Sequence, residues 1–544
     1  MGIPSYFSYI VKNYRKILVS YKTNIITIDN LYMDCNSIIY DIVYELENND
    51  SVTCNDIESK IIALVCNKIK HYIKIIKPVN NVFIAFDGVA PYAKMNQQKS
   101  RRYKTGYENN ILTRMGVKKN KKFDTVSITP GTEFMYKLSN IIKEQFNTSI
   151  EFNINKMIVS TSHESGEGEH KIYNYIRNNK EEHKNKTTVI YGLDADLIML
   201  TLNHLHIAES MYLFRETPYF IKSIDNTLNP NDNYLLKIPE FAKVLSLQLN
   251  DNNKNNYNDT RSGNNGDKYN RVIDYIFLSF LLGNDFLPHF PALNIRTTGI
   301  ERIMDVYKNL LSGTNNNLIK KGKIQWKYFR KIMLELANNE NDMIIEEYKI
   351  RNKQSRSIVN RKLDMEQHLQ SIPLFDRAVE MYINPYENGW RERYYQKLFN
   401  IDIDNDKCKQ ICINYLEGLE WTFEYYKGDC KDWEWSYKYN YPPLISDLVK
   451  YIPSFETYFL NNNPNKPVDP LVQLSYVLPK KSLYLIPNEL SNQLDSKFTE
   501  YYKDSYYIEW SFCRYLWEAH IDLPNIEIKE IEKIVNNYCK KIKT

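Results

Sequence analysis

The strongest constraint on the fold is an alternation of short apolar runs with amphipathic stretches between residue 25 and about residue 290. Four runs have the length and β-branched content of buried strands: IITIDNLYMD (25–34), NVFIAFDG (81–88), KMIVSTSH (156–163) and TTVIYGLDADLIML (187–200). Helical patterns separate them, as in IESKIIALVCNKIKHYIKII (57–76). This alternation predicts an α/β fold with a mostly parallel sheet flanked by helices.

The rest of the chain reads differently. Residues 300–460 are dense in Tyr and Trp and have a largely helical pattern. The Asn/Gly-rich stretch 249–267 and the stretch NNNPNKPVDP (461–470) are expected to be loops. We therefore expect an α/β domain at 1–295 and a largely helical second region at 296–544.

Seven carboxylates stand in or just beyond the apolar runs. They are Asp34, Asp87, Glu167, Glu169, Asp194, Asp196 and Asp285. Because ligands bind beyond the carboxyl ends of parallel strands, several of these side chains are expected at one edge of the sheet. Two carboxylates about 4 Å apart repel by roughly 4 kcal/mol at an effective dielectric of about 20, so the cluster needs cations. Hard oxygen ligands in this number favour Mg²⁺ or Mn²⁺, and two ions could serve a phosphodiester displacement.

Each acid also has a simpler interpretation. A single Asp at a strand end is more often a helix N-cap or a turn residue, and a Glu pair could lie in an exposed loop. Only the set as a whole indicates a metal centre.

A basic helix follows the second of these acids. Residues 94–122 contain ten Lys and Arg but one Glu, and Pro91 suits the first turn of a helix. Helical spacing places Lys94, Gln98, Arg101 and Arg102 on one face. Such a run is often only a solvated face. Beside a metal site, two arginines and a lysine indicate a pocket for a terminal phosphate.

Composition argues against a zinc-binding, disulfide-rich, membrane-spanning or secreted protein. The net charge is only +5, and the eight cysteines show no zinc-ligand or disulfide spacing. No apolar run is long enough to cross a membrane, and the first residues lack a signal-peptide pattern. We expect a soluble intracellular protein, with the cytoplasm favoured over the nucleus.

Several sequence blocks resemble the XRN family of 5′→3′ exoribonucleases, in family order. They are MGIPSYFSYI, MDCNSIIY, AFDGVAPYAKMNQQKSRR, HESGEGEHKIYNYIR, GLDADLIML, FLLGNDFLPH, GWRERYY, YLEGLEWTFEYYKGDCKDWEWSYKYNYPPLISD and DPLVQLSYVLPKKSLYLIP. The resemblance spans nearly the whole chain and implies a core like that of PIN and flap nucleases. It also implies that the chain is a minimal form, without the C-terminal modules of the cytoplasmic members or the zinc knuckle of the nuclear ones.

The resemblance assigns roles by position. It implies that the seven acids ligate divalent ions and that Lys94, Gln98, Arg101 and Arg102 bind a 5′-phosphate. In the family a His and a Trp stack on the 5′ base. Tyr40 stands at the His position here, and either Trp433 or Trp435 is the Trp partner, although a buried core tryptophan is an equal alternative. Stacking is worth about 1–3 kcal/mol per base and ignores sequence.

The expected function is processive 5′→3′ hydrolysis of single-stranded RNA with a 5′-monophosphate, releasing nucleoside 5′-monophosphates. Two alternatives stay open: a flap- or DNA-directed 5′ nuclease, and a catalytically inactive RNA-binding scaffold. We expect a monomer that does not contact membranes, and a decapping or accessory protein remains open as a partner.

Overall fold

The computed structural model describes residues 2–23, 26–48, 56–117, 121–217, 221–230, 232–250, 265–428, 430–460, 465–503 and 506–543. Its central element is a seven-stranded sheet in the order β1-β7-β6-β5-β2-β3-β4. The strands are β1 Leu18–Ser20, β2 Asn30–Asp34, β3 Asn81–Ala85, β4 Lys156–Ser160, β5 Thr187–Tyr191, β6 Ser210–Glu216 and β7 Asn233–Lys237. β2 to β6 run parallel, whereas β7 and β1 are antiparallel additions at one edge.

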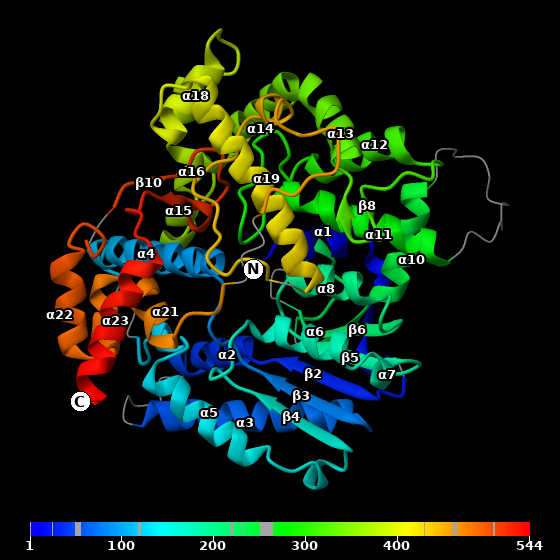
Figure 1. Ribbon diagram of the computed structural model, residues 1–544, viewed down its shortest axis with the longest axis vertical. Coiled ribbons are helices and arrows are strands. Elements are labelled where there is room, and N and C mark those ends of the chain that lie inside the picture. Colours follow the sequence, from blue (N-terminus) through cyan, green and yellow to red (C-terminus); the bar gives the residue numbers. More distant parts are fainter. Residues whose placement is uncertain are drawn as a thin grey trace.

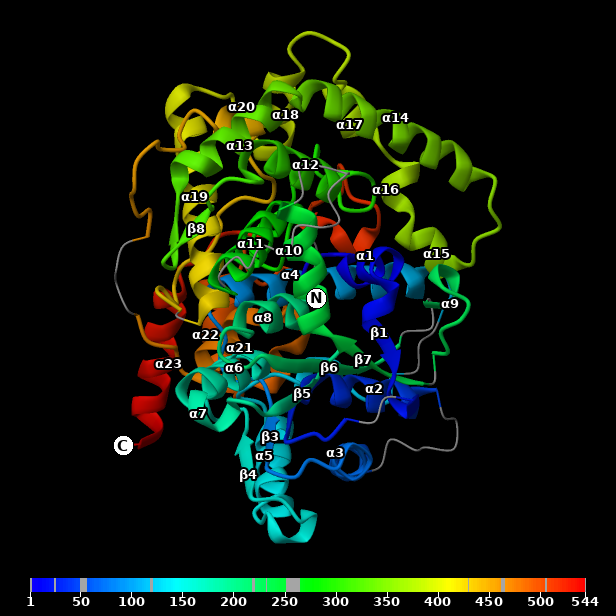
Figure 2. The same cartoon turned by 90° about the vertical axis from the view of Figure 1, so that its right-hand side faces the viewer.

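The helices of the first half cover both faces of this sheet. They are α1 Tyr6–Asn13, α2 Asn36–Glu47, α3 Ile57–Ile76, α4 Tyr92–Arg114, α5 Glu133–Gln145, α6 Gly168–Asn178, α7 Lys180–His183, α8 Asp196–His204, α9 Ile221–Ile224, α10 Ile238–Asn250 and α11 Asn265–Ser279. Side chains alternate along β2, so Leu31 and Met33 pack with α2, α3 and α5, whereas Tyr32 packs with α6 and α8. Figure 2 shows α3 below the sheet and α8 above it.

The second half is largely helical. Its helices are α12 Gly299–Leu311, α13 Trp326–Asn338, α14 Glu340–Val359, α15 Met365–Gln370, α16 Ile372–Phe375, α17 Ala378–Ile383, α18 Trp390–Phe399, α19 Asn405–Lys427, α20 Ile445–Leu448, α21 Pro470–Val477, α22 Asn488–Lys497 and α23 Ile528–Lys543. Two short antiparallel pairs accompany them: β8 Ile319–Lys320 with β9 Lys323–Ile324, and β10 Ile508–Glu509 with β11 His520–Ile521. The predicted fold class, a mostly parallel α/β sheet flanked by helices with a largely helical second region, is confirmed.

Several packing contacts tie the halves together, and two helix pairs among them are important for the site. α4 packs against α21, and Val89, Tyr92 and Met95 share a core with residues of α21 to α23. α19 packs against α8, and Figure 1 shows this long helix running from the upper helical region down to the sheet domain. Residues from both halves therefore meet above the sheet.

The local predictions hold with defined exceptions. The four predicted strands form β2 to β5, and the helix expected at 57–76 is α3. The loop predicted at 249–267 is wrong at both ends, because 249–250 end α10 and 265–267 begin α11; residues 251–264 lie outside the described part. The loop predicted at 461–470 ends one residue early, since Pro470 is the first residue of α21, and 461–464 are outside the described residues.

Candidate active site

Six of the seven predicted acids lie on the elements at one end of the parallel strands. Asp34 ends β2, Asp87 follows β3, and Asp194 follows β5. Glu167, Glu169 and Asp196 stand at the first turns of α6 and α8. These strands are parallel neighbours, so their carboxyl ends share one edge of the sheet. Carboxylates at helix N-termini are favoured by the helix dipole.

The acids are close enough to alter one another's ionisation. Burial and then the charges of Asp87 and Asp194 raise the pKa of Asp34 well above its ordinary value. Burial and then the charges of Asp194 and Asp196 raise the pKa of Glu169 well above its ordinary value.

The seventh acid, Asp285, joins this group from outside the elements that carry the other acids. Burial, followed by the charges of Asp194 and Asp285, raises the pKa of Asp196 to about 7. Asp285, which follows the 3₁₀ turn Phe280–Leu282, is thereby part of the same electrostatic cluster. The structure brings all seven predicted acids together in one mutually repelling group.

Lys94 lies inside this acidic group. Its ammonium nitrogen is 2.6 Å from Glu167 Oε1 and 2.7 Å from Asp285 Oδ2. Burial acts to raise the pKa of Asp285, but the charge and hydrogen bond of Lys94, together with other positive groups that include Arg101, outweigh it, and the pKa falls below its ordinary value. The resemblance places Lys94 in a phosphate pocket, whereas the structure places its ammonium between two carboxylates.

Two residues that the sequence did not single out orient Asp87. Asn36 Nδ2 donates to Asp87 Oδ2 at 2.7 Å, and the Gly168 amide donates to Asp87 Oδ1 at 2.7 Å. Gly168 also leaves room for another acid, because a Cβ there would lie 2.6 Å from Asp34 Oδ1. The glycine in GEGEH is thus required by close approach of α6 to the end of β2.

Several carboxylate oxygens of the cluster are buried and lack a hydrogen-bond partner among the described residues. Within the described residues, Asp34 Oδ1, Glu169 Oε2 and Asp196 Oδ1 have no hydrogen-bond partner. Buried anionic oxygens without partners are costly, so they suit a bound cation. Glu167, Glu169 and His170 offer ligand atoms within 4.8 Å of one another. His170 was missed from the sequence because its neighbours already explained the motif.

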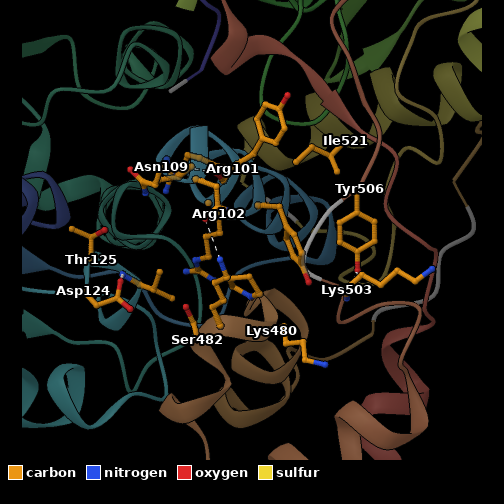
Figure 3. Close-up of a pocket in the computed structure, with 18 of the residues that line it drawn as sticks. Arg101, Arg102, Asn109, Asp124, Thr125, Lys480, Ser482, Lys503, Tyr506 and Ile521 are labelled. Carbon is orange, nitrogen blue, oxygen red and sulfur yellow. Dashed lines mark hydrogen bonds between the residues drawn. The ribbon is translucent and has the colours of Figure 1, made fainter. Parts of the chain in front are cut away.

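A basic cavity of about 400 Å³ lies along α4. Arg101 and Arg102 line it from α4, and Lys480 and Lys503 line it from the second half of the chain (Figure 3). Tyr40 is also part of the lining. The cavity therefore combines cations from two distant parts of the chain. Asp124 is an acid in the same lining.

The predicted phosphate residues divide between different surroundings. Arg102 Nη2 donates to Thr129 Oγ1 at 2.6 Å, and its Nη1 is buried with no partner in the described residues. Gln98 accepts a hydrogen bond from Gln473 at 3.5 Å. Lys94 and Gln98 are outside the cavity lining, whereas Arg101 and Arg102 belong to it.

The aromatic predictions are placed as follows. Tyr40 is 37% exposed and lines the basic cavity. Trp435 is buried and stacks on Trp421 with ring centroids 5.2 Å apart, so it is a core residue. Trp433 is half-buried, and its carbonyl accepts a hydrogen bond from the Tyr92 amide at the start of α4.

A second cavity of about 390 Å³ opens on the other side of Arg101. It reaches Asp285 and is also lined by Lys104, Arg296 and Trp517. Asp285 is therefore accessible from a cavity that residues of both halves of the chain line. Among the described residues, no helix has the length and apolar character that a membrane crossing needs.

Family models match most of the chain. A model described as the XRN 5′→3′ exonuclease N-terminus matches residues 1–217, and one described as the Xrn1 helical domain matches residues 267–381 and 376–543.

Curated relatives agree with these matches. The chain is 27% identical to 5′-3′ exoribonuclease 1 of Saccharomyces cerevisiae, over 100% of this chain and 43% of that protein. It is 27% identical to the 5′-3′ exoribonuclease 2 homolog of Drosophila melanogaster (100% and 71%) and to human 5′-3′ exoribonuclease 1 (98% and 34%). The chain thus spans less than half the length of the yeast and human relatives. With both models covering the sheet domain and the helical region that carry the acidic cluster, the chain belongs to the XRN family of 5′→3′ exonucleases.

Proposed function

We propose that the chain is a metal-dependent 5′→3′ exoribonuclease that removes nucleotides from single-stranded RNA bearing a 5′-monophosphate. The observation that carries this proposal is the convergence of seven acids, three of which have a buried oxygen without a hydrogen-bond partner among the described residues, in a protein that also has a basic cavity along α4. Its relatives are named 5′-3′ exoribonucleases, which supports the same activity.

The donor set fits hard divalent cations. One oxygen each of Asp34, Glu169 and Asp196 is buried without a hydrogen-bond partner among the described residues. Carboxylates are the ligands that Mg²⁺ and Mn²⁺ prefer. We propose that the seven acids hold two such ions. Bound there, the ions would supply the activation of water and the stabilisation of the leaving oxygen.

The chain's own residues would hold the acids in position. Asn36 and the Gly168 amide hold Asp87 in place, and Lys94 holds Glu167 and Asp285. These contacts fix the acids before substrate arrives, which reduces the reorganisation that catalysis requires.

The basic cavity would receive the 5′ end. Arg101 and Arg102 would bind the terminal phosphate, with Gln98 and Lys94 behind them on α4. Tyr40 would stack on the first base. Trp433 is the better candidate for the opposite face, because Trp435 is buried against Trp421.

One experiment tests the activity and the end preference together. Three RNAs that differ only in a 5′-monophosphate, hydroxyl or triphosphate are incubated with the chain and Mg²⁺, beside a DNA of the same sequence. We expect rapid loss of the monophosphate RNA alone, release of nucleoside 5′-monophosphates, and no digestion in EDTA. Faster digestion of the DNA would support a flap- or DNA-directed nuclease, and no digestion with Mg²⁺ or Mn²⁺ would support a binding scaffold.

Two variants test the assigned residues. Asp196→Ala should abolish cleavage while RNA binding remains, because it removes a buried oxygen ligand and not a phosphate contact. Arg101→Ala should reduce the preference for monophosphate over hydroxyl ends, since the lost guanidinium lines the cavity. Full activity in the first variant, or an unchanged preference in the second, would contradict these roles.

A further inference from the structure

A continuous stack of four rings runs from the helical region to the acidic cluster. Trp435 stacks on Trp421 at 5.2 Å, and Trp421 stacks on Tyr425 at 4.9 Å with a 19° angle between planes. Tyr425 in turn lies 3.8 Å from the His170 ring, at 32°. Trp421 and Tyr425 belong to α19, whereas His170 is in α6, next to Glu169. The stack therefore joins the two halves of the chain at the site.

The last ring of α19 binds one of the acids directly. The Tyr425 hydroxyl donates to Glu167 Oε2 at 2.6 Å. The other oxygen of Glu167 is 2.6 Å from the Lys94 ammonium. Glu167 is thus gripped at both oxygens, by a neutral donor from the helical region and by a cation from α4, and its carboxylate plane is fixed.

Tyr425 itself has little freedom to move. Phe286 meets both Trp421 and Tyr425 edge-on, at centroid distances of 4.9 and 5.5 Å. Phe286 is the neighbour of Asp285, so the same packing supports two acids of the cluster. A tyrosine ring has few rotatable bonds, and one packed on three sides presents its hydroxyl at a defined point.

We infer that Tyr425 is a positioning residue for Glu167, through which the helical region sets the geometry of the metal centre. The inference rests on the proposed function insofar as the acids bind divalent cations. Removal of a hydrogen-bond partner of a metal-ligating carboxylate typically lowers metal affinity or activity by about 10- to 100-fold. A residue 258 positions away from Glu167 thereby controls how the sheet domain holds its metal.

The test compares Tyr425→Phe with Tyr307→Phe. Tyr425→Phe keeps the stacked ring and removes only the hydroxyl. Tyr307→Phe is a matched control, because Tyr307 is also buried and its hydroxyl donates to a buried carboxylate, that of Asp274, at 2.7 Å. Tyr425→Phe loses one buried hydrogen bond, whereas Tyr307→Phe also loses the one that Arg271 Nη1 donates to the Tyr307 hydroxyl at 2.8 Å. The control should therefore lose at least as much thermal stability as Tyr425→Phe.

Mn²⁺ affinity is measured directly, by electron paramagnetic resonance of the free ion in the absence of RNA. We expect Tyr425→Phe to weaken Mn²⁺ binding by about 10-fold and Tyr307→Phe to leave it at the wild-type value. In RNA digestion at saturating metal, Tyr425→Phe should lower kcat and leave KM for RNA unchanged.

The readouts separate this inference from the proposed function. Unchanged Mn²⁺ affinity and kcat in folded Tyr425→Phe would overturn the positioning role. An equal fall in Mn²⁺ affinity in both variants would overturn it as well, since the loss would then be one of general stability. If the wild-type chain binds Mn²⁺ but digests no RNA, the proposed function fails, and the ratio of Mn²⁺ affinities still decides the role of Tyr425.

Discussion

Gly168→Ala should damage the acidic site without unfolding the protein. Gly168 is the first residue of α6, and the added Cβ would lie 2.6 Å from Asp34 Oδ1, 3.3 Å from Asp34 Cγ and 3.5 Å from the carbonyl oxygen of Ala85. Only the two atoms of the Asp34 carboxylate are too close. Because this carboxylate ends a side chain and the Ala85 contact is an ordinary one, Asp34 is the group that must move.

The size of the movement follows from the contact distance. Ordinary van der Waals contact begins at 3.4 Å, so Asp34 Oδ1 must shift by about 0.8 Å. A misplacement of about 1 Å at a reacting group can cost on the order of 100-fold in rate, so we expect kcat to fall by about 10- to 100-fold. Stability should change little, because replacing a helical glycine by alanine gains up to about 1 kcal/mol, which offsets the displacement of Asp34.

The assay measures RNA digestion, Mn²⁺ affinity and urea denaturation on the same preparations. Gly106→Ala in α4 measures the stabilisation that a glycine-to-alanine change in a helix gives by itself. A Cβ at Gly106 has no atom within 4 Å, so this variant should be more stable by about 1 kcal/mol. Wild-type kcat and Mn²⁺ affinity in folded Gly168→Ala would refute the reasoning, because they would mean that Asp34 need not occupy its present position.

Two further predictions concern the rest of the fold. Gly428→Ala should lower the free energy of unfolding, measured in urea, clearly more than Gly116→Ala does. Both glycines have positive φ (+127° and +84°), but only at Gly428 would the added Cβ meet another side chain, 2.1 Å from Arg177 Cζ. Equal losses in the two variants would contradict this reasoning. The buried carboxylate of Glu380 is paired with Arg351. Burial acts to raise the pKa of Glu380, but the charge and hydrogen bond of Arg351, together with the charge of Arg377 and the Phe512 amide, outweigh it and lower the pKa below its ordinary 4.5. A lowered folded-state pKa stabilises the fold above about pH 4.5, and this stabilisation is lost as pH falls through the folded-state value. Glu380→Gln should therefore cost a constant free energy of unfolding above pH 5 and progressively less below pH 4.5; a cost that grows on acidification would contradict the pairing.

The sheet was predictable where its signal was local. Strands β2 to β5 are continuous apolar runs, and α3 has a clean helical period, so each could be recognised from a few neighbouring residues. β6, β7 and β1 were not predicted. β7 pairs antiparallel with both β6 and β1, and β1 is an edge strand of only three residues. The pairing of β1 with residues more than 200 positions away leaves little trace in its own sequence.

For the candidate site, the sequence by itself determined the acids, since parallel strands bring their carboxyl ends to one edge whatever lies elsewhere. Tertiary structure decided what each side chain contacts. It places Lys94 between Glu167 and Asp285, buries Trp435 in the core, and brings Tyr425 of α19 to Glu167 of α6. Periodicity assigns a residue to a face of its own helix, but the partner on that face is chosen by how separate elements pack, and that choice depends on the whole chain.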